Sequence, residues 1–281
     1  MEIGFLKMQG CGTDVVVVDA ARIPPAAHAR LPDIARSILH RGFGVGGTAL
    51  LVLGAGDDAL AVRCLGTDGS DIALSCNALR CAARYASDSG KVPTGDFRIA
   101  AAGRTQRVQI IDSANVRADM GQPFSPDTNA QIRESMRDSF TKSIAVKGRT
   151  LSYTPVSIAN SYALFFVPDF SFPRRGTARE IAAHPDFPEG TGIGFVQCVS
   201  REEMRLRSWG GAEDDCTCAS AALVAAVVNG FTDREVFAHL RGGDIFLQWD
   251  ETDNRIWVTG PAVYVFTGNW DGPDLDGEKD E

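Results

Sequence analysis

The chain has 281 residues, a hydrophobic fraction of 44% and a formal net charge of -8 at pH 7. No apolar run approaches the roughly 20 residues that a transmembrane helix needs, so the composition is that of a globular protein. The negative charge argues against nucleic acid and anionic membranes as partners and leaves a small-molecule substrate as the expected one.

In the first half of the chain, short strand patterns surround one helix that is rich in small residues. Strand patterns at residues 5–8 and 15–19 flank a Gly10-Cys11-Gly12 turn, and a short helix is expected over residues 32–41. Further strands are predicted at residues 48–53, 59–65, 97–101, 105–111 and 115–119, with the small-residue helix at 77–87. Loop-forming residues at 121–129 mark a candidate link between two halves.

The second half repeats this order of elements. Strands are predicted at residues 143–146, 150–157, 162–167, 194–199, 204–208 and 236–249, with a short helix near 178–183. A second small-residue helix begins at Cys218 and ends before Gly230. The acidic residues 269–281 are expected to be a disordered, solvated tail.

An internal repeat supports two similar halves. Residues 75–83 (SCNALRCAA) align with residues 218–226 (CASAALVAA), about 140 residues later, and an acidic, turn-like stretch precedes each copy. The predicted fold class is α+β, with each half a curled, mostly antiparallel sheet wrapped around a central helix. The expected domains are 1–122 and 123–268, the tail is 269–281, and the C-terminal strand is a candidate to pack on the first half. Two helix N-termini facing each other would form one pocket in a cleft between the halves.

The cysteines, the histidines and the first residues of the chain bear on location and cofactors. Residues 1–7 have neither the charged start nor the apolar core of a signal peptide, so we expect a cytoplasmic protein. The seven cysteines are an odd number, which favours reduced thiols over a disulfide framework. No zinc-ligand spacing, nucleotide-binding loop or pyridoxal-lysine context is recognisable, so we predict no metal and no cofactor.

Six short motifs, taken together, resemble the diaminopimelate epimerase family. They are residues 7–14 (KMQGCGTD), 42–46 (GFGVG), 68–70 (DGS), 80–84 (RCAAR), 194–197 (GFVQ) and 259–262 (TGPA). The resemblance spans residues 5–268 in the family's order. It implies a cofactor-independent 1,1-proton transfer at an amino-acid α-carbon by two cysteines, one at each helix N-terminus, in a monomer or homodimer.

The chain departs from the family at the positions that carry the chemistry. Ser75 stands where the first cysteine is expected, whereas Cys218 keeps the second. Residues 159–162 (ANSY) replace a Gly-Asn-Pro-His motif and lose its histidine, and two glycines follow Trp209 where a Glu-Arg pair is expected. Thr13 replaces an asparagine of the pocket wall, and Ala49, Gly66 and Gly192 also replace polar residues. Because a site that loses such hydrogen bonds loses about 1 to 3 kcal/mol for each, diaminopimelate is not the expected substrate.

These residues leave three functional interpretations open. In the first, the protein is a cofactor-independent isomerase or cyclase of specialised metabolism that cyclises or rearranges another small molecule, with Trp209, Tyr162, Phe43 and Phe165 lining the pocket. In the second, it is a one-base proton-transfer isomerase in which Cys218 is the base and Ser75 donates a hydrogen bond. In the third, it is an inactive metabolite-binding protein and Cys218 is only a small buried side chain.

The predicted site joins both copies of the repeat. The candidate catalytic residues are Cys218 and Ser75, and the candidate substrate-binding residues are Thr13, Asn77, Asn160, Tyr162, Trp209 and Ser220.

Overall fold

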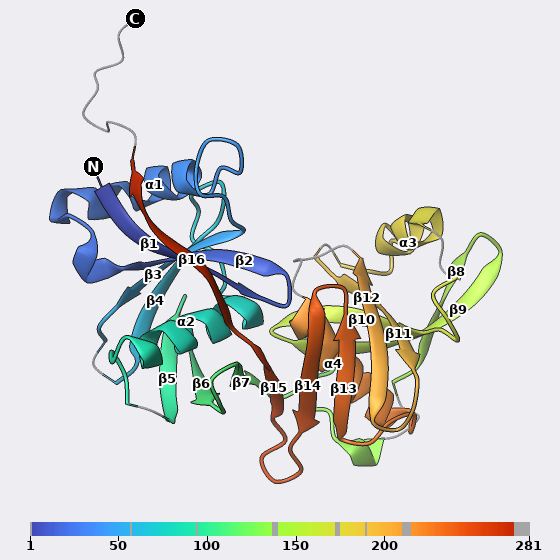
Figure 1. Cartoon of the computed structure of the whole chain (residues 1–281). Coiled ribbons are helices and arrows are strands. Elements are labelled where there is room, and N and C mark those ends of the chain that lie inside the picture. The colour runs from blue at the N-terminus through green and yellow to red at the C-terminus, as the bar shows by residue number, and fades with distance from the viewer. Residues whose placement is uncertain are drawn as a thin grey trace, which may run out of the picture. The chain divides into compact units, whose positions relative to one another are not determined.

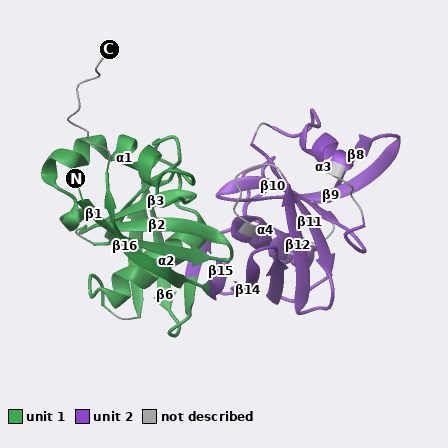
Figure 2. Cartoon of the chain, turned by 45° about the horizontal axis from the view of Figure 1, so that its top comes forward, with its two compact units in different colours: residues 1–117, 261–281 green, residues 118–260 purple. Residues whose placement is uncertain are grey.

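The chain forms two compact units, coloured separately in Figure 2. Unit 1 consists of residues 1–117 and 261–281, and unit 2 of residues 118–260. The structure is a computed structural model that describes residues 2–56, 58–93, 95–136, 140–171, 175–188, 190–209 and 215–272. The two glycines and two of the acidic residues expected before the second motif, at 210–214, lie outside the described residues, as does most of the predicted tail, at 273–281.

Unit 1 is a mostly antiparallel sheet with two helices (Figure 1). Its strands are β1 (Glu2–Gly10), β2 (Thr13–Asp19), β3 (Ala49–Gly54), β4 (Leu60–Leu65), β5 (Asp96–Ala101), β6 (Arg104–Ile110), β7 (Asn115–Gly121), which runs into unit 2, and β16 (Val263–Asp271). They are ordered β16-β1-β2-β3-β4-β5-β6-β7. The helices are α1 (Leu31–Ile38) and α2 (Cys76–Asp88), with 3-10 turns η1 (Ala20–Arg22) and η2 (Pro25–Arg30).

Unit 2 has the same kind of architecture. Its strands are β8 (Lys142–Val146), β9 (Arg149–Ile158), β10 (Asn160–Phe166), β11 (Gly192–Cys198), β12 (Glu203–Trp209), β13 (Glu235–Leu240), β14 (Gly243–Trp249) and β15 (Ile256–Pro261). They are ordered β15-β14-β13-β12-β11-β10-β9-β8. The helices are α3 (Arg175–Ala182) and α4 (Asp215–Val228), and η3 (Glu134–Met136) is a 3-10 turn.

The predicted repeat is present in the strand pairing. In unit 1, β2 and β3 are parallel, β3 and β4 antiparallel, β4 and β5 parallel, and β5 and β6 antiparallel. The series β10, β11, β12, β13 and β14 repeats this alternation in unit 2. Helix α2 connects β4 to β5, and α4 connects β12 to β13. The predicted α+β fold of two similar halves is therefore confirmed.

The long helix of each unit is buried by its own sheet. All residues of α4 from 216 to 228 are buried, and so are residues 76–83 of α2. A helix buried on every side needs small apolar residues, because strands approach it all round. The alanine-rich sequences of both helices meet that need. Gly90 and Gly230 follow the two helices with φ of +68° and +73°, which glycine adopts without strain.

The C-terminal strand does not belong to the second half. Strand β16 pairs antiparallel with β1, from Glu2 opposite Asp271 to Gln9 opposite Val263. Residues 261–268 therefore lie in unit 1 rather than in a 123–268 domain, and residues 269–271 are strand rather than tail. Apolar side chains of β1 and β16, including Phe5 and Phe266 at 5.9 Å between ring centroids, pack together and hold this pairing.

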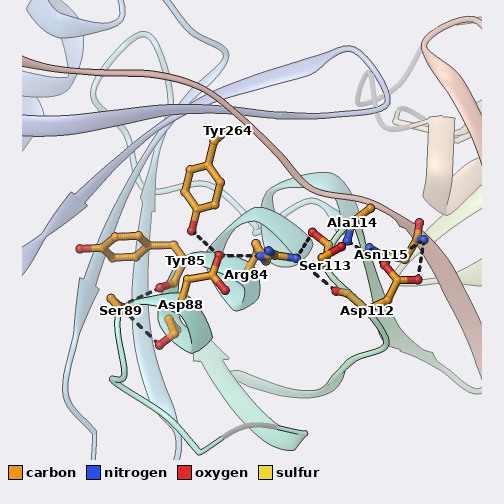
Figure 3. A network of polar contacts seen from close by, with 10 residues as sticks. Arg84, Tyr85, Asp88, Ser89, Asp112, Ser113, Ala114, Asn115 and Tyr264 are labelled. Atoms are coloured by element: carbon orange, nitrogen blue, oxygen red, sulfur yellow. Dashed lines mark hydrogen bonds and ion pairs between the residues drawn. The ribbon is translucent and has the colours of Figure 1, made fainter.

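A polar network fixes the C-terminal half of α2 within unit 1 (Figure 3). Arg84 Nε lies 2.6 Å from Asp88 Oδ2, and the Tyr264 hydroxyl of β16 donates to the same Asp88 oxygen at 2.9 Å. Arg84 also donates to the backbone carbonyls of Asp112 and Ser113, just before β7. The C-terminal half of α2 is thus tied to β16 and to the loop before β7, two segments that are far apart in sequence.

Within the described part of the chain, no helix is long and apolar enough to cross a bilayer. The structure describes all seven cysteines, and none of them is in a disulfide.

Candidate functional site

Ser75 is the N-cap of α2. Its φ and ψ of -67° and 157° are extended, and its Oγ accepts a hydrogen bond from the Ala78 backbone N at 3.2 Å. A serine in this position satisfies a helix N–H that would otherwise have no partner in the helix. The partly exposed Ser75 therefore caps the start of the helix, as the sequence motif predicts, and its hydroxyl oxygen accepts a hydrogen bond from the helix backbone.

The structure brings two predicted substrate-binding residues together in unit 1. Asn77 Nδ2 donates to Thr13 Oγ1 at 2.8 Å, which joins the first turn of α2 to the start of β2. Asn77 is only 2% exposed. Its Oδ1 accepts from Arg80 Nη2 at 2.6 Å, so both ends of the amide have protein partners.

Arg80, which contacts Asn77, was not singled out as a functional residue from the sequence. Its side chain is fully buried, one helical turn after Asn77. Its Nη1 lies 3.0 Å from Cys76 Sγ, its Nη2 lies 3.6 Å from Cys11 Sγ, and its Nε lies 3.4 Å from the Pro261 carbonyl oxygen. The sequence feature that could have pointed to Arg80 is an arginine inside an otherwise apolar helix. A buried cation needs several acceptors around it, so such a residue marks a polar cluster in the core.

A second charged cluster connects the first motif to the glycine-rich motif at 42–46. Lys7 Nζ lies 2.7 Å from Asp14 Oδ2 and also donates to the Gly46 carbonyl, and Arg41 Nη2 lies 2.8 Å from Asp14 Oδ1. Burial raises the pKa of Asp14, but the hydrogen bonds from Arg41 and Lys7 outweigh it, so the pKa is lowered from its ordinary value. Asp14 is therefore a structural anion that holds the glycine-rich turn on the β1–β2 hairpin.

Cys218 lies in the first turn of α4 but does not open the helix. The helix starts at Asp215, three residues earlier, so the sequence prediction of a helix beginning at Cys218 is wrong in this detail. Cys218 is 1% exposed. A Cβ built on Gly194 of β11 would lie 2.8 Å from Cys218 Sγ and 2.6 Å from Leu164 Cδ1. The sulfur thus lies against the strand backbone among aliphatic side chains.

Ser220 is also buried in α4. It is fully buried, and its Oγ donates to the Cys216 carbonyl oxygen at 3.0 Å, one turn back along α4. Such a bond satisfies a serine hydroxyl inside a helix. Its predicted contact with a substrate stays a prediction.

The remaining predicted residues lie at one end of neighbouring strands of unit 2. Asn160 is exposed at the start of β10, beside Ala159, whose φ of +60° is a conformation that favours glycine. Tyr162 is 4% exposed and its ring lies against Gly192, where an added Cβ would be 2.6 Å from two ring carbons. Trp209 ends β12, is partly buried and pairs with the residue after Gly192. The register therefore gathers Asn160, Tyr162 and Trp209 at this sheet end.

Two aromatic residues expected to line a pocket have very different surroundings in the structure. Phe43 is 91% exposed and packs on His40, with ring centroids 4.9 Å apart. Phe165 is 3% exposed in the apolar core of unit 2, where it contacts Tyr153 and Phe195. Phe165 therefore belongs to the core and not to a pocket wall, because an aromatic residue in a strand pattern does not reveal which face it occupies. A pocket-lining role for Phe43 stays a prediction.

The comparisons with known proteins agree with this architecture. The family model for diaminopimelate epimerase matches residues 154–265. The diaminopimelate epimerase of Desulfitobacterium hafniense is 36% identical over 280 residues, which cover 95% of this chain and 97% of that protein. The chain belongs to the diaminopimelate epimerase family. The enzyme of the same name from Moorella thermoacetica is 35% identical over 95% of this chain and 98% of its own. The resemblance stated from the motifs is thus confirmed.

Solved structures share the fold at low sequence identity. A hydroxyproline epimerase from Agrobacterium vitis aligns with a TM-score of 0.65 and 16% identity over 95% of this chain and 90% of that chain. A methylitaconate-delta-isomerase aligns with a TM-score of 0.64 and 14% identity over 96% of this chain and 95% of that chain. At these identities the likeness concerns the fold alone.

Proposed function

We propose that this member of the diaminopimelate epimerase family is a cofactor-independent isomerase or cyclase that acts on a small molecule other than diaminopimelate. The reaction is a cyclisation or rearrangement that does not require two thiols. A role in specialised metabolism fits a family scaffold whose acid–base residues have changed.

Ser75 carries this proposal. Two-base proton transfer needs a group at the N-terminus of α2 that gains and loses a proton near neutral pH, as a thiol can. A hydroxyl is far too weakly acidic unless a neighbouring base takes its proton. The Ser75 oxygen instead accepts the Ala78 backbone N–H at 3.2 Å and caps the helix. This arrangement supports a hydrogen-bonding role for Ser75 rather than that of a base.

The neighbourhood of Ser75 supports a changed substrate. Asn77 is bound on both ends of its amide by Thr13 and Arg80, so the protein orients this amide and leaves at most one N–H and one oxygen lone pair for a substrate. The fold neighbours named as a hydroxyproline epimerase and a methylitaconate-delta-isomerase support isomerase chemistry on this scaffold with more than one kind of substrate.

A one-base proton transfer through Cys218 is the second candidate. It is favoured by the position of Cys218 in the first turn of a 14-residue helix, where the helix dipole stabilises a thiolate. The names of the relatives, which are diaminopimelate epimerases, favour it as well. The burial of the sulfur against Gly194 opposes it, because a base must contact the proton that it removes.

The first experiment tests whether diaminopimelate is a substrate. Each stereoisomer of diaminopimelate is incubated in heavy water with the wild-type protein and with the Ser75→Cys variant, and deuterium at the α-carbon is measured by mass spectrometry. The wild-type protein is expected to incorporate none. Deuterium incorporation by the wild-type protein at a rate matching the Ser75→Cys variant would overturn the proposal.

The second experiment separates the remaining candidates. A metabolite extract from a host that lacks the gene is incubated in heavy water with the wild-type protein, with Cys218→Ala, and with Cys216→Ala as a buried-thiol control on the same helix. A compound whose retention shifts at unchanged mass with all three proteins supports cyclisation or rearrangement. A compound that gains one deuterium only when Cys218 is intact supports one-base proton transfer instead. A compound that binds and is returned unchanged would contradict both and indicate a binding protein.

A further inference from the structure

Two thiols from distant parts of the sequence share one buried guanidinium in unit 1. Cys11 lies in the turn between β1 and β2, and Cys76 is the first residue of α2. Arg80 Nη2 lies 3.6 Å from Cys11 Sγ, and Arg80 Nη1 lies 3.0 Å from Cys76 Sγ. Because the guanidinium is a rigid planar fork with its two terminal nitrogens on one carbon, a single side chain holds both sulfurs beside the N-terminal turn of α2.

The backbones that carry these thiols also touch. A Cβ built on Gly10 would lie 3.4 Å from the Asn77 carbonyl oxygen and 3.5 Å from Arg80 Nη2. Gly10 immediately precedes Cys11, and Asn77 immediately follows Cys76. This contact lies one residue from each cysteine, and a disulfide, which needs Cα atoms about 4.4 to 6.8 Å apart, requires neighbouring backbones of this kind.

The surroundings of Cys11 favour its oxidation more than the surroundings of the other thiols favour theirs. Cys11 and Cys198 are the cysteines with partly exposed side chains, and the other five are buried. Burial raises the pKa of Cys198 to about 11, and burial raises the pKa of both Cys64 and Cys81 to about 12. A partly exposed thiol beside a cation is the environment of a reactive cysteine, because the cation stabilises the thiolate that attacks. Cys11 has both properties.

We infer that Cys11 and Cys76 form a redox-active pair, a modification site that takes hydrogen peroxide as its oxidant and closes to a reversible disulfide. Cys11 Sγ attacks one peroxide oxygen, the O–O bond breaks, and the other oxygen leaves as water after taking a proton. This step oxidises the Cys11 sulfur to a sulfenic acid. Cys76 Sγ then attacks the Cys11 sulfur, the S–O bond breaks, and the hydroxyl leaves as a second water with the Cys76 proton. Two thiols have lost two electrons to one peroxide.

The test uses the full-length protein and hydrogen peroxide. After brief oxidation and alkylation of the remaining thiols, mass spectrometry of the digested protein is expected to find a peptide that joins Cys11 to Cys76. Dithiothreitol should remove the cross-link and restore both thiols. In the untreated protein, a small alkylating reagent at neutral pH should modify Cys11 at least about tenfold faster than Cys198.

Three variants control the experiment. Cys76→Ala should abolish the cross-link and leave the Cys11 sulfenic acid open to trapping by dimedone. Cys11→Ser should abolish both products. Cys81→Ala, a buried thiol of the same helix, should leave the cross-link unchanged. The inference is overturned if Cys198 reacts as fast as Cys11, or if peroxide yields no Cys11–Cys76 peptide in the wild-type protein. It does not depend on which reaction the protein catalyses.

Discussion

Replacing Gly194 with alanine tests directly where the Cys218 sulfur lies. The added methyl carbon would be 2.8 Å from Cys218 Sγ and 2.6 Å from Leu164 Cδ1, both shorter than real contacts allow. Overpacking of this kind in a buried site typically costs about 1 to 3 kcal/mol, and we expect a loss within that range for Gly194→Ala. Such a loss is a large fraction of the roughly 5 to 15 kcal/mol that stabilises a typical domain.

A double-mutant cycle isolates the contact with the sulfur. Cys218→Ala removes the Sγ atom and by itself should cost roughly 1 kcal/mol through lost packing. In the double variant the alanine methyl at 194 no longer meets the sulfur, although the contact with Leu164 remains. We therefore expect the double variant to be more stable than the sum of the single effects, by about 0.5 to 1 kcal/mol.

The assay is equilibrium urea unfolding followed by far-ultraviolet circular dichroism, with free energies compared at a common m-value. Gly192→Ala is the specificity control, because its methyl would meet the Tyr162 ring instead and should not couple to Cys218→Ala. Gly176→Ala in α3, where no atom lies within 4 Å of the added methyl, should be neutral or stabilising. Strict additivity of Gly194→Ala and Cys218→Ala would refute the placement of the sulfur against β11 and would reopen Cys218 as an accessible base.

Three further predictions concern the scaffold. Gly69 and Gly103 both have positive φ, of +79° and +74°, but a methyl on Gly69 would lie 2.4 Å from the Pro32 carbonyl oxygen and one on Gly103 would meet nothing within 4 Å. Urea unfolding should show a loss for Gly69→Ala that exceeds the loss for Gly103→Ala by at least about 1 kcal/mol, and equal losses would contradict the contact. Ser75→Ala should lower stability by about 0.5 to 2 kcal/mol in thermal unfolding and Ser75→Asp should restore it, whereas failure of aspartate to rescue would contradict the N-cap. Because the folded-state pKa of Asp14 is lowered, its contribution to stability is present above the unfolded-state pKa and is lost as the pH falls through the folded-state pKa. The Asp14→Asn variant should therefore be less stable than the wild-type protein at pH 7 and should lose less stability than the wild-type protein below about pH 4. An acid-unfolding profile identical to that of the wild-type protein would refute this role of Asp14.

The sequence by itself determined the elements and their repetition. A serine followed by a small-residue segment and a glycine predicts a capped helix, and α2 follows Ser75 and ends two residues before Gly90. The strand patterns and the two related motifs predicted two similar α+β halves, because side-chain periodicity and turn residues are local properties of the chain. The resemblance of the motifs to the family predicts that Ser75 stands where the first cysteine is expected.

Only the tertiary structure decided which residues from distant segments meet. Strand β16 could have extended the second half, but its pairing with β1 places it in unit 1, since strand partners depend on register and packing across the whole fold. The burial of Cys218 against Gly194 depends on the start of α4 and on the β11 backbone together. The contacts of Arg80 with Cys11 and with the Pro261 carbonyl join residues 69 and 181 positions apart. Such contacts leave no periodic signal in the sequence, because a buried guanidinium takes its acceptors from whichever segments the fold closes around it.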